Sequence, residues 1–295
     1  MGGLTLLNDI IFKIVFGSET SRPVLRALLN ALLGLSGRER IADLDILNPH
    51  LDKDYVLDKG VILDVKARDG QGRLYNIEVQ VASEPAYTER AVYYVTRLFS
   101  GQLEKGEPYS HLARTIGISL CDFLLFPDLQ DLHSTYRLYD PEHGRTLTDI
   151  LELHFIELSK FRRDKPHELR TPFEKWLHVL KFGELYEGDP GQVPEVLKQE
   201  EGIEMALEGM RRACASDEVR ELVESRMKAM RDWASRLEHA HQEGREEGRA
   251  EGVQEGLQRG ERKALLETAR RMREAGIPAE VIATVTGLRP EALDS

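Results

Sequence analysis

The sequence predicts an α/β core followed by a mostly helical C-terminal extension. Three observations support this fold class. Over residues 1 to about 160, short apolar stretches alternate with turn-forming residues. The chain then becomes charged, with its apolar residues at helical spacing, and after residue 240 glycine recurs at every fourth position. We therefore expect a core (1–165), a charged helical segment (166–240), a charged helix with periodic glycine (241–275) and a small helical tail module (276–295).

Two helices are expected at the start of the chain, over residues 9–19 and 21–35. In the second, Ser21 is a suitable cap and Pro23 falls in the first turn. Leucines recur there at helical spacing and form one apolar stripe, at positions 25, 28, 29, 32 and 33.

A β-hairpin is expected next, after a short strand that Pro49 stops. Its strands cover residues 61–67 and 77–81, and the polar sequence RDGQGRL forms the turn. A helix follows over 86–103. The remaining core strands are predicted over 115–126, 134–140 and 151–158, and an amphipathic helix over 173–186.

The periodic glycines stand at 244, 248, 252, 256 and 260. Steps of four residues turn a helix by 400°, so these glycines form a slowly winding seam, and each costs about 1 kcal/mol relative to alanine. Between Gln242 and Gly276 there are eight acidic and eight basic residues. A solvated spacer and a self-associating helix both remain open.

The tail, with short helices opened by Pro278 and Pro290, suits a docking module or an incomplete DNA-binding helix-turn-helix.

Composition narrows the classes of function. The 295 residues carry a net charge of −11, which argues against avid non-specific binding to nucleic acid. We expect a protein without membrane partners, because no apolar run approaches the roughly 18–20 residues of a spanning helix. Two cysteines without CxxC spacing favour a reduced, cytoplasmic protein. No phosphate-binding GxxxxGK[ST] loop or HExxH motif occurs.

Acidic and amide side chains gather on one face of the predicted hairpin. Asp64 and Glu78 lie about equally far from the turn, while Gln80 shares the face of Glu78 and Lys66 shares that of Asp64. This is either a solvated sheet face or a site for a hard divalent cation. In the second case Asp64, Glu78 and the main-chain carbonyl of Val79 are the ligands, and Gln80 orients the attacking water.

Three stretches together resemble the Rpn family of recombination-promoting, transposase-like nucleases, part of the PD-(D/E)XK superfamily. They are NDIIFKIVFG (8–17), DKGVILDVKARDGQGRLYNIEVQV (58–81) and ERAVYYVTRLFSGQLEKGEPYSHL (89–112). The resemblance covers residues 5 to about 160. It implies a restriction-endonuclease-like mixed sheet flanked by helices and Mg²⁺-dependent DNA cleavage, with Asp64 and Glu78 as acidic ligands. Gln80 stands where the wider superfamily pattern has lysine, so Lys66 or Arg90 is expected to supply that positive charge.

Further candidates lie on the two helices nearest the hairpin. Asp9 is an accessory acidic ligand or a helix-capping residue, and an ion pair with Lys13 one turn later is the structural alternative. Arg90 either contacts phosphate or is structural. For Tyr94, one turn after Arg90, core packing is favoured.

Two functions follow from these observations. The first is a DNA endonuclease that uses Mg²⁺ or Mn²⁺, is linked to recombination or mobile elements, and forms a homodimer through the C-terminal helix. The second is a non-catalytic interaction protein that keeps the nuclease fold and uses the same helix to bind partners. A transposase that also joins strands rests on the family resemblance alone.

Overall fold

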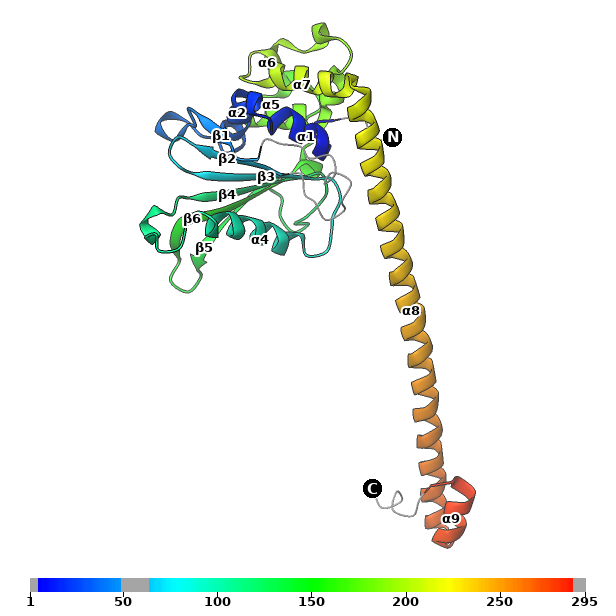
Figure 1. Ribbon diagram of the computed structural model, residues 1–295. Coiled ribbons are helices and arrows are strands. Elements are labelled where there is room, and N and C mark those ends of the chain that lie inside the picture. Colours follow the sequence, from blue (N-terminus) through cyan, green and yellow to red (C-terminus); the bar gives the residue numbers. More distant parts are fainter. Residues whose placement is uncertain (1–4, 49–63, 289–295) are drawn as a thin grey trace. The chain divides into compact units, whose positions relative to one another are not determined.

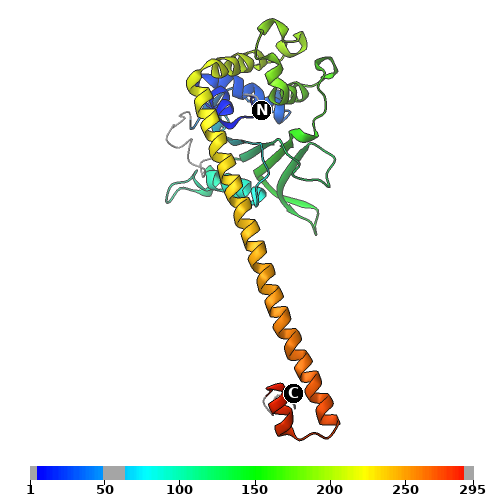
Figure 2. The same ribbon diagram turned by 90° about the vertical axis from the view of Figure 1, so that its right-hand side faces the viewer.

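The computed structural model describes residues 5–48 and 64–288 (Figure 1). The chain divides into two compact units, residues 1–229 and 230–295. The first contains a mixed six-stranded sheet with flanking helices, as the sequence predicts. The second contains the larger part of α8 (Asp217–Glu274) and α9 (Ala279–Thr286), which Figure 2 shows from a second side.

The strand order of the sheet is β1-β2-β3-β4-β6-β5. The first three strands are antiparallel neighbours, β3, β4 and β6 run parallel, and β5 pairs antiparallel with β6. Glu78 and Gln80 therefore lie on a central strand. The bounds are β1 (Leu44–Ile46), β2 (Val65–Asp69), β3 (Leu74–Gln80), β4 (Thr115–Cys121), β5 (His133–Asp140) and β6 (Arg145–Glu157).

Helices cover both faces of the sheet (Figure 1). One face carries α1 (Asp9–Phe16), α2 (Arg22–Leu32), α5 (Pro172–Phe182) and α7 (Ile203–Ala215), with the short α6 (Glu195–Lys198) beside them. The other face carries α4 (Tyr87–Ser100). Short 3-10 turns connect these elements at Glu19–Ser21, Gly37–Glu39, Tyr109–His111, Leu158–Lys160, Pro166–Glu168, Gly183–Tyr186 and Pro190–Gln192.

Each face of the sheet has its own apolar cluster. The larger one includes Phe12, Phe16 and Trp176, with the rings of Phe16 and Trp176 6.1 Å apart. Helices α5 and α7 thus contribute to the same core as α1 and α2, because their charged residues leave an apolar stripe facing inward. The smaller cluster lies under α4 and contains Tyr87, Ala91, Cys121 and Phe155.

The helix α4 lies very close to strand β4. A Cβ added at Gly117 would come within 2.2 Å of Cγ2 of Val95, a buried residue of α4. Because only glycine leaves this space, the backbone at position 117 lies directly beneath the helix. This contact determines how near the other side chains of α4 come to the sheet.

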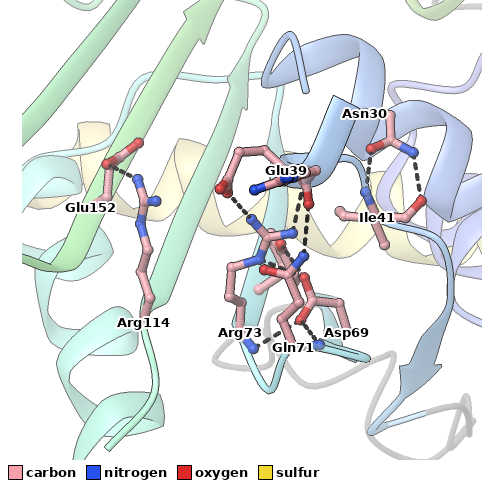
Figure 3. A network of polar contacts seen from close by, with 10 residues as sticks. Asn30, Glu39, Ile41, Asp69, Gln71, Arg73, Arg114 and Glu152 are labelled. Carbon is pink, nitrogen blue, oxygen red and sulfur yellow. Dashed lines mark hydrogen bonds and ion pairs between the residues drawn. The ribbon is translucent and has the colours of Figure 1, made fainter. Parts of the chain in front are cut away.

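A polar cluster closes the β2–β3 hairpin (Figure 3). The Asp69 carboxylate accepts bonds from Arg73 Nε at 2.6 Å and from the Tyr75 hydroxyl at 2.9 Å. The Arg73 guanidinium also donates to the Glu39 carboxylate at 3.0 Å and to the Glu39 carbonyl at 2.9 Å. Arg73 and Asp69 are buried, so this network fixes the turn and with it the hairpin register.

Several element boundaries differ from the sequence expectation. The strand expected over 115–126 ends at Cys121, and the helix expected over 9–19 ends at Phe16 because Gly17 follows as its cap. Val81, the last residue of the strand expected over 77–81, lies beyond the end of β3 and is 50% exposed. Of the strand expected over 61–67, residues 61–63 lie outside the described part of the chain, as does the tail helix expected after Pro290.

The second unit is dominated by the charged part of α8. A Cβ at any of the five periodic glycines would meet no atom within 4 Å. Ion pairs one turn apart support the helix, among them Glu255–Arg259 at 3.2 Å and Glu267–Arg271 at 2.6 Å. Among the described residues, no helix combines the length and apolar character needed to cross a membrane.

Candidate active site

The hairpin register sets the two acidic residues opposite each other. Val65 pairs with Ile77 and Lys66 with Asn76, so the same register extended by one residue places Asp64 across from Glu78. Asp64 lies immediately before β2, and its side chain is 13% exposed. Because side chains alternate along a strand, Asp64, Lys66, Glu78 and Asn76 share the face that α4 covers.

The Glu78 carboxyl is a buried acid with a perturbed pKa. Its residue is 2% exposed, and burial raises the pKa of this carboxyl to about 7. The positive charge of Arg90 opposes this rise, whereas the negative charges of Asp64 and Glu84 add to it. Such a carboxyl exchanges its proton near neutral pH, and a cation at this position would favour its ionised form.

Arg90 connects three side chains of the site. It comes from α4, and its Nη2 donates to Glu78 Oε1 at 3.1 Å and to Gln80 Oε1 at 3.2 Å. Its Nη1 pairs with Glu84, and its guanidinium lies over the Tyr87 ring, 5.1 Å from the centroid. The guanidinium is therefore held in one orientation, directly beside the acidic strand.

Gln80 is oriented by its neighbours on both sides of the amide. Its Nε2 donates to the carbonyl of Ala82 at 3.0 Å and to Glu84 Oε1 at 2.9 Å, while its oxygen accepts from Arg90. It follows Glu78 on the same face of β3. This amide carries no charge, whereas Arg90 and Lys66 each place a positive charge beside one of the two carboxylates.

Each oxygen of the Asp64 carboxylate has a polar partner among the described residues. Oδ1 accepts from the Asn48 side-chain amide at 3.1 Å, and Oδ2 lies 3.2 Å from Lys66 Nζ. The Asn48 amide also donates to the Asp64 carbonyl at 3.1 Å and accepts from the Lys66 main-chain N–H at 2.7 Å. The sequence did not identify Asn48 as part of the site. The one sequence feature near it is the proline that follows, Pro49, which favours a turn at this point.

The main-chain carbonyl of Val79 points to the edge of β3 that pairs with β2. The next carbonyl, that of Gln80, accepts from the Asp122 N–H at 2.9 Å on the β4 side. Successive carbonyls along a strand point to opposite edges, so that of Val79 faces β2. The oxygens of Asp64, Glu78 and Val79 thus all belong to the junction of β2 and β3.

The ion pair between Asp9 and Lys13, which the sequence offered as the structural alternative, does not form. The Asp9 carboxylate lies 2.7 Å from Nε of Arg226, on the first part of α8, and its other oxygen accepts from the Ile10 N–H. The capping role falls to Asn8, whose side chain accepts from Ile10 and Ile11. Asp9 therefore anchors α8 to the start of α1.

Lys13 instead reaches the main chain beside the acidic pair. Its Nζ donates to the Asn48 carbonyl at 2.5 Å and to the Asp64 carbonyl at 2.9 Å. The residue is 4% exposed, and burial lowers the pKa of Lys13 to about 8, although the charge of Asp64 opposes this. In the sequence, the one sign of this arrangement is a glycine four residues after Lys13, Gly17, where a Cβ would come within 2.7 Å of Cδ of the lysine.

Tyr94 lies on the same helix as Arg90 and is half-buried, with its ring 5.6 Å from that of Tyr93. Burial raises the pKa of Tyr94. The charge of Arg90 opposes this rise, and those of Glu78 and Asp64 add to it. The phenol thus lies within electrostatic reach of the acidic pair.

The oxygen donors at this junction suit a hard divalent cation. Mg²⁺ commonly uses one or two carboxylates together with water and substrate phosphate. Asp64 and Glu78 supply two carboxylates. Burial is the main cause of the raised pKa of Glu78, and the negative charge of Asp64 adds to it; a cation between the two carboxylates would relieve that repulsion. In the described part of the chain, no cluster of three or more His, Cys, Asp or Glu side chains is arranged to hold a metal.

Comparison with known proteins gives one match. The sequence model of a family described as PD-(D/E)XK nuclease family transposase matches residues 6–240. That span contains the whole sheet and every residue of the candidate site. No curated protein and no solved structure shows significant similarity to the chain.

Proposed function

The chain belongs to the PD-(D/E)XK nuclease family transposases, and from this membership we propose that it is a metal-dependent DNA endonuclease linked to recombination or mobile elements. The observation that carries the proposal is the pair of carboxylates formed by the half-buried Asp64, just before β2, and the buried Glu78 on β3, with Gln80 and Arg90 beside Glu78. A cytoplasmic location is part of the same proposal, since the DNA substrate would be met there.

Asp64, Glu78 and the Val79 carbonyl would hold Mg²⁺ or Mn²⁺. When bound, the cation supplies Lewis-acid stabilisation of the phosphodiester and a more acidic water for attack. Gln80 orients that water through its amide, which Glu84 and Ala82 already hold in place. Lys66 and Arg90, each paired with one of the carboxylates, supply the positive charge toward the phosphate that a lysine at position 80 would otherwise carry.

Cleavage of a supercoiled plasmid tests the proposal. The purified full-length protein should nick or linearise the plasmid in Mg²⁺ or Mn²⁺ and should be inactive in EDTA. Ca²⁺ should support less cleavage, because it prefers six to eight ligands and a more flexible shell. Well-folded protein that leaves single- and double-stranded DNA intact under all these conditions would favour the alternative, a non-catalytic interaction protein.

We also propose that the protein forms a homodimer through the glycine seam of α8. Five glycines cost a solvated helix roughly 5 kcal/mol in total relative to alanine, and no other part of the described chain fills the space above them. Close approach of a second helix would offset this cost.

Sedimentation of the full chain, and of a variant with alanine at all five glycine positions, tests the proposed dimer. The wild type should sediment as a dimer, and the variant should dissociate more readily. A monomeric wild type would contradict the proposal.

A further inference from the structure

A buried lysine lies behind the candidate metal site, on the face of the sheet opposite α4. Lys13 belongs to α1, and its Nζ donates to two main-chain carbonyls, those of Asn48 and Asp64. Asn48 follows β1 by two residues, and Asp64 immediately precedes β2. One side chain thus joins the end of one strand to the beginning of its neighbour.

The path of this side chain depends on a glycine one turn later. A Cβ at Gly17 would lie 2.7 Å from Cδ and 3.2 Å from Cε of Lys13, and 2.6 Å from the Lys13 carbonyl oxygen. Gly17 has an ordinary negative φ of −103°, so its backbone does not itself require glycine. Glycine at position 17 is therefore explained by space: without a Cβ it leaves room for the side chain of Lys13.

The Asn48 side chain completes the connection. Its amide donates to both the carbonyl and the carboxylate of Asp64 and accepts from the Lys66 main-chain N–H. The Asp64 carbonyl therefore receives two donors, Lys13 Nζ and Asn48 Nδ2. With its main chain held at this point, the Asp64 carboxylate has little freedom to turn away from Glu78.

We propose that Lys13 is a positioning residue of the metal site, which acts through Asn48 and the main chain of Asp64 to hold the Asp64 carboxylate opposite Glu78. This inference rests on the function proposed above. Lys13 does not touch substrate, because it is buried beneath the carbonyls that it bridges. Partners of this kind typically contribute 10- to 100-fold to metal affinity.

The chain contains a matched control. Lys181 of α5 also bridges two carbonyls, those of Leu158 at 2.7 Å and Phe161 at 2.8 Å, and burial lowers its pKa as well. Neither carbonyl belongs to the candidate site. Lys181→Met therefore removes the same kind of interaction as Lys13→Met, without affecting the main chain of Asp64.

The test measures Mn²⁺ binding to the full-length protein by the electron paramagnetic resonance signal of free Mn²⁺. Lys13→Met should raise the Kd for Mn²⁺ by about 10- to 100-fold, whereas Lys181→Met should bind like the wild type. Excess Mn²⁺ should largely restore plasmid cleavage by Lys13→Met, because the metal ligands themselves are retained. Thermal unfolding of both variants reports any general loss of stability.

Each result has a distinct meaning. Wild-type affinity in Lys13→Met, or an equal loss in both lysine variants, overturns the inference while leaving the proposed function in place. A wild-type protein that binds no Mn²⁺ rejects the metal site and the inference together. If Lys13→Met does not fold, the half-buried Asn48→Ala should show the same weakening, and unchanged binding there contradicts the inference.

Discussion

Cleavage of supercoiled DNA by the Asp64→Asn variant should be at least about 1,000-fold slower than by the wild-type protein. The substitution keeps the size of the side chain and the acceptor for Asn48, but it removes the negative charge that a divalent cation requires. Loss of a few kcal/mol of charge stabilisation corresponds to a factor of this size, because each 1.36 kcal/mol changes the rate about tenfold. Initial rates of plasmid nicking in Mg²⁺ provide the measurement.

Asp45→Asn is the control for this experiment. Asp45 lies on the neighbouring strand β1, where its exposed carboxylate pairs with Arg22 at 2.8 Å. An exposed ion pair contributes little to stability, so this variant should cleave DNA like the wild type. Equal rates for Asp64→Asn and the wild type would remove Asp64 from the active site.

Glu78→Gln should make the metal-free protein more stable at pH 8, by about 1 to 3 kcal/mol. The pKa of this carboxyl is about 7 in the folded protein, against an ordinary value of 4.5, because burial disfavours its charge. Between these two values the folded protein retains a proton that the unfolded chain has released. The free energy of unfolding of the wild type therefore falls as the pH rises from about 4.5 to about 7 and stays low above that.

Urea unfolding at pH 5 and pH 8 in EDTA measures this difference. The free energy of unfolding of Glu78→Gln should exceed that of the wild type clearly at pH 8. The difference should shrink toward pH 5, where the wild-type carboxyl is protonated. Saturating Mg²⁺ should stabilise only the wild type, because binding to the folded state alone raises stability. A wild type that is the more stable protein at pH 8 would show that Arg90 fully offsets the burial of Glu78.

Glu152 offers a control of opposite sign. It is also buried, yet hydrogen bonds from His154, Arg137 and Arg114 outweigh the effect of burial and hold the pKa of its carboxyl well below the ordinary range. Figure 3 shows its contact with Arg114, which is 2.5 Å long. Glu152→Gln should therefore destabilise the protein at pH 8. The two buried glutamates of this sheet would thus respond to the same substitution in opposite directions, as expected if Glu152 is structural and Glu78 is the proposed metal ligand.

The arrangement of the hairpin could be predicted because it depends on local rules. Alternation along the strands puts Glu78 and Gln80 on one face, and a turn centred on Gly70 and Gly72 sets the register that brings Asp64 opposite Glu78. Neither step needs information from elsewhere in the chain. The mixed sheet and its flanking helices followed from the same alternation together with the family resemblance.

The partners of the acidic residues could not be predicted, because they come from distant parts of the chain. Lys13 contacts main-chain carbonyls 35 and 51 residues away, and main-chain acceptors leave no trace in a sequence pattern. For the same reason, the alternative in which Asp9 pairs with Lys13 is not the one that the structure shows. Arg226, 217 residues further on, takes the Asp9 carboxylate instead.

The packing of α4 on Gly117 has a consequence for transferring this site to another protein. The distance between Arg90 and Glu78 is set in part by an apolar contact, that of Val95 above a residue without a side chain. A graft that copied only the charged side chains onto a new scaffold would lose this spacing, since any Cβ at the equivalent of position 117 would lift the helix or displace the valine. The smallest segment that could be transferred with its geometry intact therefore comprises the hairpin, α4 and β4 together. Gly117 and Val95 must be kept in it, because their contact sets the distance of α4 from the sheet.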